Sequence, residues 1–125
     1  MNKNHFFIGE GALFRDTPVL PHGLNGIHIS SKAVIGSNVT IFHQVTIGSN
    51  TIQGHKRYGS PAIGDNVYIG AGAKIIGNVT IGENCRIGAN AVVVKDMEPN
   101  TVAVSAPTRF IKSSRYLTNV FIPLE

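Results

Sequence analysis

Aliphatic residues recur at every sixth position along most of this chain. The series runs from Ile29 to Ile47, pauses, and resumes from Ile63 to Val93. A small or apolar residue usually stands four places after each of these positions, and Asn or Gly fills the place before it in seven of ten units. A period of six fits neither the α-helical period nor the simple alternation of an isolated strand. The pattern is therefore a hexapeptide repeat, which predicts an all-β fold of the parallel β-helix type.

Each hexad is expected to form a short strand followed by a corner. The first and fifth positions point into the column, and the fourth lies at the corner, where Asn and Gly tolerate a left-handed backbone at the least cost. Three hexads make one triangular coil, so that Ile87, three hexads after Ile69, is expected directly above it. Successive coils stack at the spacing of paired strands, about 4.8 Å.

The register of the coils follows from counting. The separation of Ile69 from Ile41 exceeds one coil by the length of the segment 53–62, where the repeat is interrupted. This segment is therefore predicted to be a loop that leaves a corner. With the loop set aside, three dipeptides stack along one edge, with Asn25 one coil lower, beneath His43: His43-Gln44, Ala71-Gly72 and Ala89-Asn90.

The chain of 125 residues is expected to form a single domain, 1–125. Residues 1–28 keep only a ragged repeat and are predicted to form an irregular coil that caps the open hydrophobic end of the column. Coils are predicted over 29–104, interrupted by the loop 53–62. Residues 105–125 leave the repeat and are predicted to be a C-terminal tail.

Composition narrows the classes of function. A net charge of +4 suits an anionic ligand or an ordinary basic surface, and without a run of like charges we expect no nucleic-acid partner. The single cysteine, Cys85, occupies an inward position and is predicted to be a core thiol in a reducing compartment, which favours a cytoplasmic location. No apolar stretch approaches the roughly 20 residues of a membrane span.

Four segments carry a resemblance to a known family: 21–27 (PHGLNGI), 41–48 (IFHQVTIG), 69–78 (IGAGAKIIGN) and 106–109 (APTR). On these residues the chain resembles the left-handed β-helix acyltransferases, in the branch of serine acetyltransferases and polysaccharide O-acetyltransferases. The resemblance covers about three quarters of the chain, from residue 22 to residue 111. The hexads are specific for the fold, whereas the histidine segment and the closing APTR segment are what favour an acetyl-CoA enzyme.

The resemblance implies a left-handed coil, a homotrimer with active sites between adjacent subunits, and acetyl-CoA as co-substrate along a stacked corner. Carried over position by position, it implies that Ala71 and Ala89 offer backbone groups to the pantetheine arm. It also implies that Lys95, Arg109 and Lys112 face the nucleotide phosphates. The count of hexads agrees with the first of these position-by-position implications, since it independently places Ala71 and Ala89 along one edge of the column.

His22 matches the catalytic histidine of the family. Transfer of an acetyl group from a thioester to a hydroxyl needs a base, and an imidazole, with an ordinary pKa of about 6.5, suits this task. We expect direct attack of the hydroxyl on the thioester, without a covalent acetyl-enzyme and with backbone N–H groups stabilising the oxyanion. His43 is a possible assistant, either as a contact to the acyl end or by orienting His22, or else a structural corner residue. Asp16 is a candidate acidic partner.

Three departures from the family bear on the acceptor. Pro21 stands where serine acetyltransferases have an acidic residue, one extra residue separates His22 from Gly26, and Gly59-Ser60 replaces the Arg-His pair that holds the serine carboxylate. These differences favour a carbohydrate acceptor, the hydroxyl of a nucleotide sugar or of a surface polysaccharide unit, and hence a role in polysaccharide biosynthesis. Serine O-acetylation, as in cysteine biosynthesis, is the alternative, so that the acceptor is either a small molecule or a carbohydrate.

Two other classes use the same coil. A γ-class carbonic anhydrase needs about three converging histidines for zinc, and that class closes its site with two histidines five places apart. Here the nearest pairs, His22 with His28 and His43 with His55, are both more widely spaced, so we expect no metal site. A non-catalytic scaffold would have no reason to keep the APTR segment beside a corner histidine.

Overall fold

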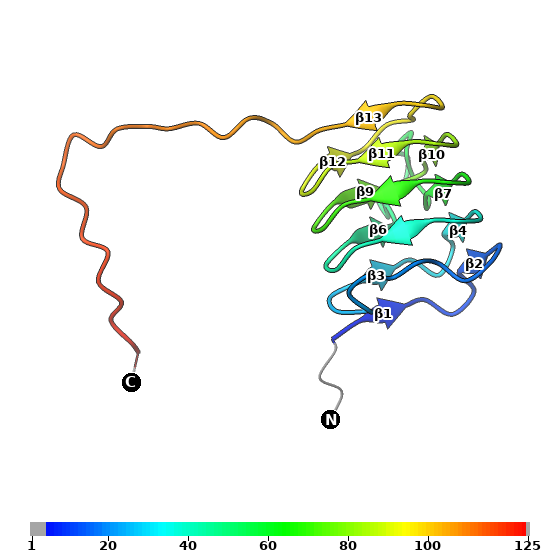
Figure 1. Ribbon diagram of the computed structural model, residues 1–125, viewed down its shortest axis with the longest axis horizontal. Helices are drawn as coiled ribbons and strands as arrows, with labels where there is room; N and C mark the ends of the chain where they lie inside the picture. Colours follow the sequence, from blue (N-terminus) through cyan, green and yellow to red (C-terminus); the bar gives the residue numbers. More distant parts are fainter. Residues whose placement is uncertain (1–4, 125) are drawn as a thin grey trace.

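The computed structural model describes residues 5–124, which form an all-β column followed by an extended tail (Figure 1). Residues 1–4 of the predicted cap and Glu125 of the predicted tail lie outside this range. Three parallel sheets make the three faces of the column. Face A contains β1 (Phe7–Ile8), β3 (His28–Ile29), β6 (Thr46–Gly48), β9 (Lys74–Ile76) and β12 (Val92–Val93). Face B contains β2 (Leu13–Phe14), β4 (Val34–Ile35), β7 (Ala62–Ile63) and β10 (Thr80–Ile81). Face C contains β5 (Thr40–Ile41), β8 (Tyr68–Ile69), β11 (Arg86–Ile87) and β13 (Val102–Ala103).

The strands pair in the register that counting predicts. Ile41 of β5 pairs with Ile69 of β8, and Ile69 pairs with Ile87 of β11, with all three strands parallel. More residues separate Ile41 from Ile69 than separate Ile69 from Ile87. The extra residues, which belong to the interruption of the repeat, therefore lie outside the three faces. Each strand therefore hydrogen-bonds to the coil below and the coil above rather than to its neighbour in sequence, which makes the column a solenoid.

The core is a single column of aliphatic side chains. Every predicted opener from Ile29 to Val93 is buried, as are eight of the ten residues at the fifth hexad position. Met97 is only partly buried, and Thr51 is exposed. Thr51 was expected to point inward, but the chain has already left the column at this residue. Cys85 is buried, as predicted, and its thiol donates to the carbonyl oxygen of Glu98 at 3.1 Å.

The extruded loop begins and ends earlier than the predicted range 53–62. Asn50 and Gly59 exchange two backbone hydrogen bonds of 2.8 and 3.0 Å in an antiparallel bridge, which closes the loop around residues 51–58. Pro61 is already buried and Ala62 already belongs to β7. The loop boundaries therefore differ from the predicted ones because the backbone pairing of Asn50 with Gly59 fixes where the loop leaves the coil and where it returns.

A ladder of asparagines closes the corner between faces B and C. Asn38, Asn66, Asn84 and Asn100 all have left-handed backbones, with φ between 53° and 60°. The side-chain amide of Asn38 donates to Asn66 at 2.7 Å, Asn66 donates to Asn84 at 2.9 Å, and Asn84 donates to Asn100 at 2.5 Å. We call these four residues the ladder corner.

Residues 104–124 contain no strand and run away from the top of the column after β13 (Figure 1). Their large apolar side chains are exposed, including Phe110, Tyr116 and Phe121. Residues 5–124 contain no helix that is long and apolar enough to cross a membrane.

Candidate active site

His22 lies on an irregular turn in the first coil. The two ends of this turn are in different registers: Val19 pairs with Thr40, more than one coil further along, whereas Asn25 accepts a hydrogen bond from the amide of Gln44 at 2.8 Å, in the register of one three-hexad coil. Counting therefore placed Asn25 correctly, but the segment between Val19 and Asn25 holds three more residues than the segment above it. These extra residues form a turn, closed by the Asn25 side-chain amide donating to the His22 carbonyl oxygen at 3.1 Å. The turn carries His22 out to the side of the column.

A groove of about 450 Å³ runs up the column from this turn. It follows the corner between faces C and A, which we call the groove corner and define by His43-Gln44, Ala71-Gly72 and Ala89-Asn90. The groove joins His22 and His43 at its lower end to Ala71 and Ala89 above them. Its full lining is His22, Phe42, His43, Tyr68, Gly70, Ala71, Arg86, Ile87, Gly88 and Ala89.

Aromatic contacts hold the lower end of the groove. The ring of His22 lies 5.8 Å from that of Phe42 and 5.1 Å from that of His43, centroid to centroid, and the two imidazoles meet edge to face at 83°. Phe42 lies 5.2 Å from Tyr68 on the next strand. The Nδ1 atom of His43 is buried and has no hydrogen-bond partner among the described residues. A buried, unsatisfied polar atom is costly, which makes His43 a natural contact for His22 or for a ligand.

The walls of the groove present unused backbone groups. At the groove corner, Gly72 N–H donates to His43 and Asn90 N–H donates to Ala71, so each coil is tied to the coil below. The N–H groups of Ala71 and Ala89 make no backbone hydrogen bond within residues 5–124. Both alanines line the groove, where these two N–H groups are free to bind an extended polar molecule.

The other predicted site residues lie elsewhere in this chain. Lys95 is on the corner between faces A and B, where it lines a separate pocket of about 400 Å³ with His55, Lys56 and Arg57. Arg109 and Lys112 are exposed in the tail that leaves the column. The structure therefore brings together His22, His43, Ala71 and Ala89, and it does not bring the three predicted phosphate-binding residues to the groove of the same chain.

Asp16, the candidate acidic partner, lies at the foot of the ladder corner. Its carboxylate accepts the backbone N–H of Asn38 at 3.2 Å, and it is not among the residues that line the groove. The acidic partner of His22 predicted from sequence is therefore not found at this position. Sequence reasoning also missed Phe42, Tyr68 and Arg86. Tyr68 and Arg86 are outward positions of β8 and β11 and Phe42 directly follows β5, and all three look like ordinary solvated residues in the sequence. Tyr68 and Arg86 precede the openers Ile69 and Ile87, so they share the face that ends in Ala71 and Ala89.

The extruded loop is clamped to a neighbouring coil. Arg57 donates to the Asp96 carboxylate at 2.9 Å and to the Asn78 carbonyl oxygen at 3.2 Å. The backbone N–H of Thr80 donates to the same carboxylate at 2.8 Å. This backbone hydrogen bond, assisted by the positive charge of Arg57, lowers the pKa of Asp96 below its ordinary value of 3.8.

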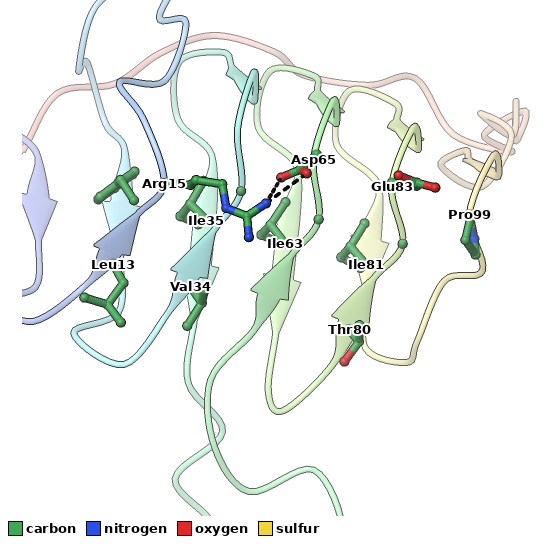
Figure 2. A pocket seen from close by; sticks show the side chains of 14 residues that line it. Leu13, Arg15, Val34, Ile35, Ile63, Asp65, Thr80, Ile81, Glu83 and Pro99 are labelled. Carbon is green, nitrogen blue, oxygen red and sulfur yellow. Dashed lines mark hydrogen bonds and ion pairs between the residues drawn. The ribbon is translucent and has the colours of Figure 1, made fainter.

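A larger groove of about 620 Å³ lies on face B, over Val34, Ile63 and Ile81 (Figure 2). Figure 2 shows Arg15 reaching across it to Asp65, an exposed ion pair of 3.2 Å. This groove contains no histidine and none of the predicted site residues. Within residues 5–124, no three His, Cys, Asp or Glu side chains gather closely enough to hold a metal ion.

The class of fold is defined by the repeat itself. The family model described as bacterial transferase hexapeptide (six repeats) matches residues 60–95. Together with the parallel faces and the similarity to solved structures given below, this match confirms the predicted left-handed parallel β-helix of hexapeptide repeats.

The relatives are serine acetyltransferases. The chain is 44% identical to that of Mycobacterium tuberculosis over 108 residues, 86% of this chain and 46% of the relative. It is 49% identical to the chloroplastic serine acetyltransferase 1 of Arabidopsis thaliana over 104 residues, 83% of this chain and 30% of the relative. The predicted resemblance to left-handed β-helix acyltransferases is thus confirmed. The chain spans less than half the length of either protein.

Solved structures agree with the sequence matches. The serine acetyltransferase isoform 3 of Entamoeba histolytica, in complex with cysteine, superposes with a TM-score of 0.72 at 35% identity, covering 88% of this chain and 39% of that one. The soybean serine acetyltransferase complexed with serine gives 0.68 at 42% identity, covering 81% and 40%.

Proposed function

We propose that this chain is an acetyl-CoA-dependent O-acetyltransferase whose reaction takes place in the groove beside His22. The observation that carries the proposal is the arrangement of the groove: an imidazole at one end and two free backbone N–H groups along the wall, within a chain similar to serine acetyltransferases. A base and a channel for an extended thioester are the two things that this reaction needs.

The groove fits the co-substrate. Acetyl-CoA supplies an activated acetyl group on a thioester, at the end of a long amide-containing arm. The free N–H groups of Ala71 and Ala89 suit the carbonyl groups of such an arm. Gly70 and Gly88, which precede the two alanines, also line the groove.

His22 acts as the general base in this proposal. Its imidazole accepts the proton of the acceptor hydroxyl as the oxygen attacks the thioester carbonyl, and returns a proton to the departing thiolate. The acetyl group moves from sulfur to oxygen in one direct transfer, and no acetyl-enzyme forms. His43, edge-on to His22, fixes the orientation of its ring. A backbone N–H directed at the developing oxyanion lowers the barrier further.

Serine is the acceptor that the comparisons favour, because the named relatives at 44% and 49% identity are serine acetyltransferases. This reverses the order expected from the sequence, which placed a sugar hydroxyl and polysaccharide biosynthesis first. A sugar hydroxyl stays as a second candidate on one observation. At the positions of the Arg-His pair of the family, Gly59 is bridged to Asn50, and the Ser60 hydroxyl is within 2.9 Å of those of Ser30 and Ser49.

The predicted homotrimer is part of this proposal. Lys95, Arg109 and Lys112 lie off the groove of their own chain, so the role predicted for them at the phosphates requires a neighbouring subunit. Light scattering after size exclusion should give three times the chain mass.

The test is release of CoA from acetyl-CoA with serine and, separately, with a panel of sugars and nucleotide sugars. Turnover with serine is the expected result. Turnover with a sugar and not with serine would restore the second candidate. A failure to release CoA with every acceptor, from protein that binds CoA, would contradict the proposed function.

A further inference from the structure

The upper end of the column is open. β12 and β13 are the last strands of faces A and C, so within the described residues no strand pairs with their upper edges. A pocket of about 540 Å³ lies at this end; we call it the top pocket, and residues 92–98 and 101–103 line it. Met97 and Ala103 are only partly buried there. A solenoid needs a cap at each end, because the last coil otherwise leaves its apolar interior exposed.

The tail, residues 105–124, carries the apolar side chains that a cap needs. Phe110, Tyr116 and Phe121 are 96%, 95% and 85% exposed. Within residues 5–124 the tail forms hydrogen bonds only with itself, between Ser113 and Arg115. Figure 1 shows the tail leaving the column at the level of β13 and running away from it. The tail therefore does not cap the column from which it departs, and its apolar side chains are left without a partner.

Charge and length both fit the tail to the top pocket of another copy. The tail contains three basic residues and no acidic one. The top pocket contains two acidic side chains, Asp96 and Glu98, against the single positive charge of Lys95. Surfaces of opposite charge favour association. An extended chain advances about 3.3 Å per residue, so the tail can reach roughly 65 Å, whereas one side of a coil, six residues long, is roughly 20 Å.

We infer that the tail of one copy of this chain caps the top pocket of a second copy. Its aromatic side chains cover the open end of the core, and its extended backbone lies against the unpaired edges of β12 and β13. The two columns stand side by side, since the tail leaves at the height of the end that it covers. The inference concerns assembly and does not rest on the proposed reaction.

The first test is a disulfide between two differently tagged full-length chains that are co-expressed. One chain carries Val94→Cys in the top pocket, and the other carries Phe110→Cys, Tyr116→Cys or Phe121→Cys in the tail. After oxidation, at least one of the three tail positions should give a disulfide that joins the two tags. The native Cys85 is buried and does not compete.

Val34→Cys is the matched control for the top pocket, because Val34 is an exposed valine on face B, outside that pocket. Paired with the same three tail cysteines, it should give no disulfide. A tail that joins Val34→Cys and not Val94→Cys would move the docking site to face B and overturn the inference. Absence of a mixed disulfide at all three positions would do the same, as would a disulfide that forms only within a chain carrying both cysteines.

The second test needs no cysteine. Trypsin cleaves after Arg109, Lys112 and Arg115, which a docked tail protects. Val94→Asp places a charge in the top pocket, at a side chain that is 56% exposed, and should speed these cleavages at least about tenfold by raising the population of free tails. Val34→Asp, at a side chain that is 45% exposed, should stay within about twofold of wild type. Equal cleavage rates in the two variants would overturn the inference.

Discussion

The ladder corner and the groove corner share one backbone and differ in their side chains. Both place a left-handed residue in each coil, Asn66 at one corner and Gly72 at the other, with φ of 56° and 72°. At the ladder corner the amides join coil to coil and close the edge. At the groove corner the left-handed residue of the middle coil is Gly72, which has no side chain to continue such a ladder, and a groove runs along the outside of the joined coils. Backbone geometry therefore makes the corner, and side-chain length decides whether it is sealed or available for binding.

The largest effect should come from the base at the foot of the groove corner. In His22→Asn, kcat/KM is expected to fall about 100- to 10,000-fold, because the acceptor hydroxyl loses its proton acceptor. The side chain is exposed, so the thermal midpoint should not change. Steady-state kinetics and thermal unfolding measure the two quantities. His28→Asn, on face A and outside the groove, is the control, and equal losses in both variants would refute the assignment.

The backbone of the groove corner should be intolerant of added atoms. A Cβ at Gly70 would lie 2.8 Å from the backbone nitrogen of Ala89 and 3.0 Å from the carbonyl oxygen of Ile87. Backbone atoms of the next coil cannot move aside singly, so Gly70→Ala should lower the free energy of unfolding by about 3 kcal/mol. Denaturant titration measures this.

Gly48→Ala provides the contrast, because its Cβ would meet only the ends of side chains, the Cδ1 atom of Ile76 at 3.1 Å and the Cγ2 atom of Thr46 at 3.4 Å. Its cost should stay below about 1 kcal/mol. Equal costs for the two substitutions would mean that the coils are not held as closely as described.

The ladder corner should lose stability and keep activity. Asn66→Ala removes amide hydrogen bonds to Asn38 and Asn84 and places a β-carbon in a left-handed backbone, for a loss of about 2 kcal/mol. Asn66→Gly removes the same amide but tolerates the backbone, for a loss of about 1 kcal/mol. Denaturant titration of both variants separates the two contributions. A fall in turnover for either variant would show that the two corners are coupled.

The smallest effect concerns pH and the loop clamp. The hydrogen bond from Thr80 and the charge of Arg57 hold the pKa of Asp96 below 3.8, so its contribution is complete above that value and is lost as pH falls through the lowered pKa. Hydrogen-exchange protection of the Asn50 and Gly59 amides should therefore weaken below about pH 4. Asp96→Asn should abolish this pH dependence, and a dependence unchanged in that variant would exclude the clamp as its source.

Much of the fold follows from the sequence because the hexad fixes which side chains are inside. Ile41, Ile69 and Ile87 could be stacked by counting alone, and so could Asn25 beneath His43. Thr51 stands at an inward position of its hexad and is nevertheless exposed. The backbone bridge between Asn50 and Gly59 places it in the loop, and such a bridge leaves no pattern of side chains in the sequence.

The site was less predictable for a related reason. Its alanines sit inside the repeat and could be placed, whereas His22 sits on a turn whose length no period specifies. Arg86 occupies an outward position that a solvated residue would fill equally well. Arg109 and Lys112 belong to a segment without a repeat, so no register relates them to the groove.

The turn at residues 20–24 carries the proposed base, whereas the coils above it carry most of the buried core. Since it adds three residues to one layer and leaves every layer above it unchanged, a short in-frame deletion would trim that layer to the common length. The His22 imidazole would then be removed from the groove, and a β-helix without the proposed base would remain. Conversely, an in-frame insertion of three codons would be enough to add such a turn, with a reactive side chain, to a β-helix that lacks one.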